Sequence, residues 1–416
     1  MRVWRRFVRR AGPPAGAAFP PTILVVAGEA SGDSHGAALV AELRTLMPRA
    51  RFVGIGGEAL AAQGLELLAR AQDLAVVGFT EVLGRLPAVV RALKAVSRTL
   101  QQERPALVIL IDFPDFNFWV ARLAAWHRVP VMYYISPQVW AWRRYRVRTL
   151  ARYVNRLAVI FPFEEPFYRE RGLAATFVGH PFVDDLRPLP PRETLLAQWG
   201  LDPRGFTLAL LPGSRKSEIE RHLPAMLAGA RLVQQAIPAA QILLPLASTA
   251  PRELVEGMIR DFWEDAAGTP GARPSCLTLQ PGQAYAALQA AHLAVVASGT
   301  VTLEAALAGT PTVIVYRVAP LTFALARRLI RVPHVGMANL LAGERMFPEL
   351  LQHFFTPENL AREVLAWVRW PARLAALRRQ LMRAVTSLGG PGASRRAARV
   401  ALELIQDYQG ERPGEG

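Results

Sequence analysis

The chain has 416 residues, of which 51% are hydrophobic and 20% are charged, and its formal net charge is +16. This composition excludes an intrinsically disordered protein, and the length predicts two domains with a core each. The single cysteine, Cys276, excludes an intrachain disulfide and a zinc site built on several cysteines. The positive charge suits nucleic acid, an anionic membrane surface or a phosphorylated substrate as a partner.

The first 21 residues are basic and then rich in Ala, Gly and Pro, without an apolar core of signal-peptide length. We expect residues 1–21 to form a basic, disordered extension. No run of about eighteen uninterrupted apolar residues occurs in the chain, so we expect no transmembrane helix.

The first half of the chain alternates short apolar runs with segments of helical spacing. This alternation predicts a parallel sheet with helices on both faces. The predicted strands are 22–27, 51–55, 106–111, 129–135, 156–161 and 175–178, and the predicted helices include 35–47 and 86–103.

The same alternation restarts after a Pro-rich boundary at 186–192. Strands are predicted at 206–211, 241–246, 293–297 and 312–316, with a helix at 219–236. We therefore predict two Rossmann-like, doubly wound α/β domains, at 22–185 and 193–390, that face a cleft at the carboxyl ends of their strands. A helix at 391–408 is expected to pack back across the junction.

A strand, a Gly/Ser turn and a helix follow one another at Leu211-Pro-Gly-Ser-Arg-Lys-Ser-Glu-Ile219. Gly213 and Ser214 allow backbone amides to approach a phosphate at the positive end of the helix, and the guanidinium of Arg215 suits diphosphate oxygens. The alternative is an ordinary turn with an exposed arginine.

Two carboxylates follow the first predicted strand, in Gly28-Glu-Ala-Ser-Gly-Asp33. The glycine spacing differs from the dinucleotide fingerprint, so it does not predict NAD. Glu29 and Asp33 suit hydrogen bonds to sugar hydroxyls, and a simple tight turn is the alternative.

Asp112 ends the third strand, in Ile111-Asp-Phe-Pro-Asp-Phe-Asn117, where catalytic groups are expected in an open α/β sheet. A carboxylate there can act as a general base, with its pKa adjusted by the aromatic neighbours. Pro114 predicts an extended conformation for Phe113. Asp115 and Asn117 can instead cap the next helix, and the sequence leaves open whether Asp112 or Asp115 is the base.

A second strand–glycine–helix unit occurs at Ala297-Ser-Gly-Thr-Val-Thr-Leu-Glu304. Ser298, Gly299 and Thr300 can offer backbone amides to a diphosphate, and Glu304, one turn later, can hold ribose hydroxyls. Helix capping is an alternative for the Ser and the Thr.

An aromatic and then basic stretch extends from Tyr133 to Arg148. It can be a core strand that leads into an exposed cationic helix, a surface that stacks RNA bases, or a rim that faces lipid or phosphate.

Taken in order, these segments resemble the lipid-A-disaccharide synthases, bacterial glycosyltransferases. The resemblance covers residues 22–408. It also rests on Val77-Gly-Phe-Thr-Glu-Val82, Ser136-Pro-Gln-Val-Trp-Ala-Trp-Arg143, Val178-Gly-His-Pro181 and Asn339-Leu-Leu-Ala-Gly343.

The resemblance implies a GT-B fold and an inverting transfer that needs neither a metal nor a cofactor. The donor would be UDP-2,3-diacylglucosamine, the acceptor 2,3-diacylglucosamine 1-phosphate, and the products the β-1,6-linked disaccharide 1-phosphate and UDP. Asp112, Glu29 and Arg215 would be catalytic. The UDP-sugar would bind Gly213, Ser214, Arg215, Ser298, Gly299, Thr300, Glu304 and Asn339.

The acyl chains of such substrates require an apolar surface, which we predict at 74–87. Phe79, Leu83, Arg85 and Arg91 would face the acceptor and the phospholipid of the cytoplasmic face of the inner membrane. A core loop and helix is the alternative there. The resemblance also implies a homodimer that exchanges C-terminal elements.

Three other functions are weighed against this one. A UDP-GlcNAc 2-epimerase and a glycosyltransferase of peptidoglycan precursors use the same fold, and the segments around Asp112 and Trp140 argue against both. An RNA-binding protein would use the stripe at 143–148, but no known RNA-binding module is recognisable, and we expect no nucleic-acid partner.

Overall fold

The computed structural model describes residues 20–74, 81–141, 144–186, 188–247, 250–267, 277–319, 323 and 332–410. The chain divides into two compact units, each built from more than one segment. The first unit comprises the described residues of Met1–Pro137, Thr149–Ala158 and Ser394–Gly416, and the second those of Gln138–Arg148 and Val159–Ala393.

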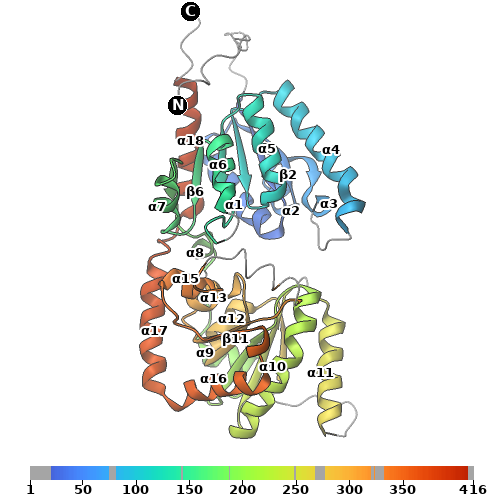
Figure 1. Ribbon diagram of the computed structural model, residues 1–416, viewed down its shortest axis with the longest axis vertical. Coiled ribbons are helices and arrows are strands. Elements are labelled where there is room, and N and C mark those ends of the chain that lie inside the picture. Colours follow the sequence, from blue (N-terminus) through green and yellow to red (C-terminus); the bar gives the residue numbers. More distant parts are fainter. Residues whose placement is uncertain are drawn as a thin grey trace, which may run out of the picture. The chain divides into compact units, whose positions relative to one another are not determined.

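The first sheet has seven strands in the order β3-β2-β1-β4-β5-β6-β7. Strands β2 and β6 of this sheet are labelled in Figure 1. Strands β1 and β4 lie at its centre and are buried on both faces, so they read in the sequence as continuous apolar runs. The strands are β1 (Thr22–Ala27), β2 (Arg51–Gly56), β3 (Glu66–Arg70), β4 (Leu107–Ile111), β5 (Val131–Tyr134), β6 (Arg156–Val159) and β7 (Ala175–Phe177). The boundary between the two units falls within β6.

Helices connect these strands, as parallel pairing requires. They are α1 (Ala30–Leu46), α2 (Glu58–Ala62), α3 (Ala71–Leu74), α4 (Glu81–Gln102), α5 (Pro114–Trp126), α6 (Val147–Tyr153), α7 (Glu164–Arg169) and α8 (Pro181–Asp185), with a 3₁₀ turn η1 (Arg144–Arg146). Helix α4 begins five residues before the predicted start at Leu86, and Pro87 lies inside it.

The second sheet has six parallel strands in the order β10-β9-β8-β11-β12-β13. Its centre is again apolar and buried, in β8 and β11. The strands are β8 (Thr207–Leu211), β9 (Gln241–Leu246), β10 (Leu277–Pro281), β11 (Leu293–Ala297), β12 (Thr312–Tyr316) and β13 (Glu349–Leu351).

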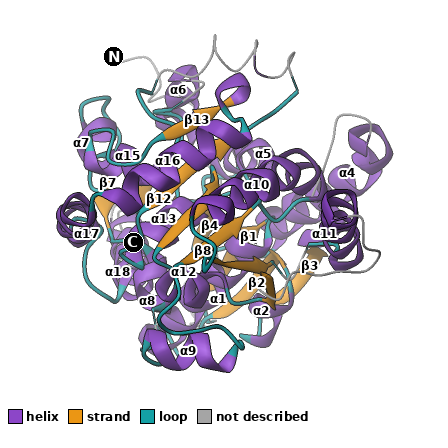
Figure 2. Cartoon of the chain, turned by 90° about the horizontal axis from the view of Figure 1, so that it is seen from below, coloured by secondary structure: helices purple, strands orange, loops and turns teal. Residues whose placement is uncertain are grey.

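The helices of this second sheet pack onto it through apolar side chains. Figure 2 shows the helices of the chain in purple and the strands in orange. Helix α16 comes close to α10 at Gly229, where an added Cβ would meet the Leu360 side chain at 2.7 Å. The helices are α9 (Arg192–Gln198), α10 (Lys216–Ala236), α11 (Arg252–Ala267), α12 (Ala284–Ala290), α13 (Val301–Leu307), α15 (Met337–Ala342), α16 (Pro357–Arg369) and α17 (Pro371–Thr386), with a 3₁₀ turn η2 (Gln352–Phe354).

The last helix, α18 (Ala393–Gly410), belongs to the first unit from Ser394 onward. Arg156 on β6 pairs with Asp407 at 3.2 Å, and the Tyr408 hydroxyl donates to the carbonyl of Arg128 at 2.9 Å. These contacts tie the C-terminal helix to the first sheet.

The predicted architecture of two parallel α/β sheets is confirmed, and each predicted strand is present. Three further strands, β3, β10 and β13, were not predicted, and each is an edge strand. Among the described residues, no helix combines the length and the hydropathy needed to cross a membrane.

Candidate active site

Asp112 and Glu29 follow the ends of two neighbouring strands of the first sheet. Strands β1 and β4 pair with Ala27 opposite Ile111, so the residues that follow them emerge at the same edge. Gly28 makes this possible, because an added Cβ would lie 2.1 Å from the ring of Phe113. Glu29 precedes α1 and is exposed.

The backbone at Asp112 is left-handed rather than extended. Asp112 has a φ of 45° and Phe113 has a φ of 47°, so the predicted extended conformation of Phe113 is wrong. The Asp112 carbonyl explains why, since it accepts hydrogen bonds from the Tyr133 hydroxyl at 2.6 Å and from Asn117 Nδ2 at 2.7 Å. Such a backbone costs on the order of 1–3 kcal/mol per residue and is typical of functional sites.

Burial, together with the negative charge of Glu29, raises the pKa of the Asp112 carboxyl from 3.8 to about 6. A hydrogen bond from the backbone of Phe113 acts against this shift and lowers the pKa. A carboxylate with a pKa near neutrality can both accept a proton and remain largely ionised at pH 7. Asp115 lies one turn away, exposed in the first turn of α5.

Asp33 has a structural role instead of the sugar contact expected from the sequence. Its buried carboxylate accepts backbone hydrogen bonds from Gly57 at 2.6 Å, Ala59 at 2.9 Å and Leu60 at 3.2 Å. It therefore caps the amino end of α2, since the first amides of a helix lack partners within the helix.

Arg215 and its neighbours form a turn between β8 and α10. Gly213 has a φ of +118°, a conformation that glycine adopts readily, and Ser214 and Arg215 are exposed. The backbone amides of Ser214 and Arg215 point toward Glu218 Oε2, at 3.2 and 3.4 Å. The Arg215 guanidinium pairs with Glu218 Oε1 at 3.2 Å, although 61% of its side chain is exposed. We call the amides of Ser214 and Arg215, with the Arg215 guanidinium, the β8 anion cradle.

Ser298, Gly299 and Thr300 follow the adjacent strand β11. Because β11 pairs with β8 in parallel, this second turn lies at the same edge of the sheet as the β8 anion cradle. Gly299 and Thr300 are exposed, and Ser298 Oγ donates to the carbonyl of Val335 at 3.1 Å.

Glu304 lies one turn into α13 and is half-buried. Burial raises the pKa of its carboxyl. Within the described part of the chain, this carboxylate has no hydrogen-bond or ion-pair partner. A desolvated, unpaired carboxylate one helical turn after the exposed turn at Gly299 and Thr300 is a candidate ligand contact.

Asn339 is fully buried, and its amide is occupied by protein groups. Its Nδ2 donates to the Phe347 carbonyl and to Glu349 Oε1, both at 2.9 Å, and its Oδ1 accepts from Phe347 N at 2.8 Å. Glu349 in turn accepts from the amides of Val335 and Gly336. Asn339 thus fixes the start of α15, where Ser298 is anchored.

The sequence profile described as lipid-A-disaccharide synthetase matches residues 23–404. The chain is 46% identical over 384 residues to the lipid-A-disaccharide synthase of Syntrophus aciditrophicus, which covers 92% of this chain and 98% of the relative. It is 45% identical over 388 residues to that of Myxococcus xanthus, over 93% and 98% of the two chains. The chain belongs to the lipid-A-disaccharide synthase family.

Solved structures of other enzymes share the fold of this family member. A putative UDP-N-acetylglucosamine 2-epimerase from Listeria monocytogenes has a TM-score of 0.62 at 12% identity, over 95% of this chain and 99% of that one. The calicheamicin glycosyltransferase CalG4 has a TM-score of 0.56 at 17% identity, over 95% and 100%. At these identities the likeness shows the fold alone, which confirms the predicted GT-B class.

The predicted acceptor-facing and membrane-facing residues are only partly described. Phe79 lies outside the described residues, and Leu83 and Arg85 are described only as part of the backbone of α4. Arg91 is exposed on the same helix, as are the apolar side chains of Leu86 and Val90.

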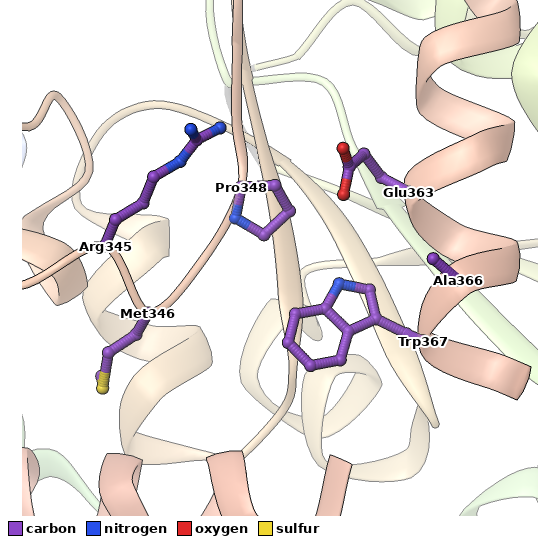
Figure 3. Close-up of a pocket in the computed structure, with 6 residues that line it drawn as sticks. All are labelled: Arg345, Met346, Pro348, Glu363, Ala366 and Trp367. Carbon is purple, nitrogen blue, oxygen red and sulfur yellow. The ribbon is translucent and has the colours of Figure 1, made fainter. Parts of the chain in front are cut away.

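A cavity of about 290 Å³ lies in the second unit, between the segment before β13 and helix α16 (Figure 3). It contains none of the predicted site residues. Arg345 and Glu363 project from its opposite sides, and the indole of Trp367 forms part of its wall. Among the described residues, no cluster of His, Cys, Asp or Glu is arranged to hold a metal ion.

The aromatic segment before the basic stripe is part of the core in this family member. Trp140 is buried, and its indole N–H donates to Glu164 Oε1 at 2.9 Å. Its ring also packs edge-on against Phe163. The Trp140 ring is therefore not available to stack on a base, whereas Tyr145 in the basic stripe is exposed.

The sequence gives no sign that His222 has a special role, because its position is that of any buried residue of an amphipathic helix. Its Nδ1 contacts the Pro212 carbonyl at 2.8 Å, and its Nε2 accepts from Arg317 N at 3.0 Å. Burial lowers its pKa, so the ring is neutral, with the proton on Nδ1. His222 thus fixes the turn that carries the β8 anion cradle to the end of β12.

Proposed function

We propose that this chain transfers the diacylglucosaminyl group of UDP-2,3-diacylglucosamine to the 6-hydroxyl of 2,3-diacylglucosamine 1-phosphate. The bond from the anomeric carbon to the UDP oxygen breaks, and a β-1,6 bond to the acceptor oxygen forms. The products are the disaccharide 1-phosphate and UDP. The observation that carries the proposal is the Asp112 carboxylate, held with a pKa of about 6 at the carboxyl edge of a sheet in a chain of this family.

Asp112 serves as the general base in this reaction. It takes the proton of the acceptor hydroxyl as the oxygen approaches the anomeric carbon, and a base with a pKa near the working pH does this best. Glu29 keeps the Asp112 pKa high through its charge. Tyr133 and Asn117 hold the main chain of Asp112 in the required conformation.

The second unit binds the UDP part of the donor. The β8 anion cradle and the turn at Ser298, Gly299 and Thr300 lie on adjacent strands, so their amides can bind one diphosphate. Negative charge gathers on UDP as it leaves, and the guanidinium of Arg215 stabilises that charge. Glu304 accepts hydrogen bonds from ribose hydroxyls, and Asn339 acts indirectly by positioning α15.

Incubation with both acylated sugars tests the proposal. UDP and the disaccharide 1-phosphate should form in equal amounts, and neither should form when the acceptor is left out. Release of UDP without an acceptor, or conversion of the donor to its 2-epimer, would contradict the proposed transfer.

We also propose that the amino-terminal part of α4 and the segment before it bind the cytoplasmic face of the inner membrane. Leu86 and Val90 expose apolar side chains next to the positive charge of Arg91, a combination that favours anionic lipid surfaces. Reversing the charge at Arg85 and Arg91 should reduce sedimentation with phosphatidylglycerol vesicles.

The matched control for this binding test reverses two exposed arginines elsewhere in the first unit, Arg49 and Arg152. Equal loss in both double variants would indicate a general effect of net charge. Unchanged sedimentation of the Arg85 and Arg91 variant would contradict the proposed surface.

The homodimer with exchanged C-terminal elements remains a proposal from the family resemblance. Helix α18 contacts the first sheet through Asp407 and Tyr408, and an exchange would make these contacts between two chains. Light scattering on the purified protein tests it, and the monomer mass at all concentrations would contradict it.

A further inference from the structure

Glu218 occupies the groups that the proposed donor site offers to a diphosphate. Its Oε2 accepts from the amides of Ser214 and Arg215, and its Oε1 pairs with the Arg215 guanidinium. These three donors are the β8 anion cradle, so one carboxylate uses all of it. Only 18% of the Glu218 side chain is exposed, which shows that it is folded against the turn rather than extended into solvent.

The turn is shaped so that this carboxylate fits. A Cβ added to Gly213 would lie 2.5 Å from Glu218 Oε2, so a larger residue would displace the carboxylate. The three contacts are also long, at 3.2 to 3.4 Å, and long hydrogen bonds are weak. Glu218 is therefore held closely enough to block the cradle and loosely enough to leave it.

We propose that Glu218 is an internal anion that competes with the diphosphate for the β8 anion cradle. The inference rests on the proposed function, in which the cradle binds UDP. When the donor binds, the carboxylate rotates away and the diphosphate takes over its three donors. When UDP leaves, the carboxylate returns and helps to displace it. Glu218 thereby weakens the binding of both the donor and the product UDP.

The size of the effect follows from the share of molecules in which the carboxylate blocks the cradle. If it blocks about four molecules in five, the apparent Kd for UDP is about fivefold higher than that of an open cradle. Removing the charge of Glu218 should therefore tighten UDP binding about fivefold and strengthen product inhibition by UDP to a similar extent.

Calorimetric titration with UDP and with inorganic pyrophosphate tests this on the full-length protein. The Glu218→Gln variant keeps the shape of the side chain and removes its charge. The control is Glu220→Gln, because Glu220 lies on the same helix and contacts Lys216 rather than the cradle. Both variants change the net charge equally. Thermal unfolding by circular dichroism confirms that each is folded.

The expected result is tighter binding of both ligands by Glu218→Gln, with Glu220→Gln close to the wild type. Binding by Glu218→Gln that is unchanged or weaker would overturn the inference and would mean that Glu218 only shapes the turn. Equal tightening in both variants would also overturn it, because net charge would then explain the effect. Arg215→Ala distinguishes a failure of this inference from a failure of the proposed donor site. If it binds UDP as well as the wild type does, the proposed donor site itself is wrong.

Discussion

The raised pKa of Asp112 predicts a specific pH dependence of the reaction. The ordinary value for this carboxyl is 3.8, and burial together with the charge of Glu29 raises it to about 6. At pH 5 roughly one tenth of the molecules then carry an ionised Asp112, compared with about nine tenths for an unperturbed carboxyl. Because the base must be ionised to accept a proton, kcat/KM should fall about tenfold between the plateau and pH 5.

The Glu29→Gln variant tests the cause of this shift. Removing the neighbouring charge should move the acidic limb of the profile to lower pH, because less repulsion opposes ionisation of Asp112. Glu42→Gln is the control, since Glu42 lies about 20 Å further along α1. The assay is UDP release from saturating donor at low acceptor concentration from pH 4.5 to 8. A wild-type profile that is flat down to pH 5 would refute the reasoning.

Three further substitutions test the parts of the site separately. Arg215→Ala should stay folded and lose roughly a hundredfold or more in turnover, because charge on the leaving UDP is no longer stabilised; wild-type kinetics would exclude this role. Tyr133→Phe removes the hydrogen bond to the Asp112 carbonyl. It should lower the free energy of unfolding, measured with urea, by about 1 kcal/mol, and it should lower kcat/KM several-fold. Burial lowers the pKa of His222 in the folded state, so this side chain binds a proton more readily in the unfolded state than in the folded state. The free energy of unfolding should therefore fall as the pH drops below the ordinary histidine value of 6.5. His222→Asn should reduce this dependence, leaving the part that is due to His292, and an unchanged slope would show that His222 contributes nothing.

The central strands of both sheets could be predicted from the sequence because burial on both faces leaves a continuous apolar run. Strands β1, β8 and β11 begin and end within a residue of the prediction. The edge strands β3 and β10 are mostly half-exposed, and their sequences ELLAR and LTLQP show no such run. They form because the adjacent strands, β2 and β9, offer backbone groups for hydrogen bonds. This depends on the tertiary structure and not on the local sequence.

The site shows the same division between local signals and tertiary contacts. Strand ends place Asp112 and Glu29 at one edge, and this follows from the order of the strands in a parallel sheet. The left-handed turn at Phe113 could not be predicted, because Tyr133, twenty residues further on, helps to hold it. The contact between Glu218 and the β8 anion cradle has the spacing of a capping box, from Arg215 before the helix to Glu218 at its third position, and this signal is present in the sequence.

In the proposed mechanism Asp112, in the first unit, acts as the base, and the second unit binds UDP. Turnover and UDP affinity measured on the same Asp112→Asn sample separate these two roles. The variant should bind UDP with the affinity of the wild type while its turnover falls by about a hundredfold or more. Turnover at the wild-type rate, or a loss of UDP affinity in step with turnover, would contradict this mechanism.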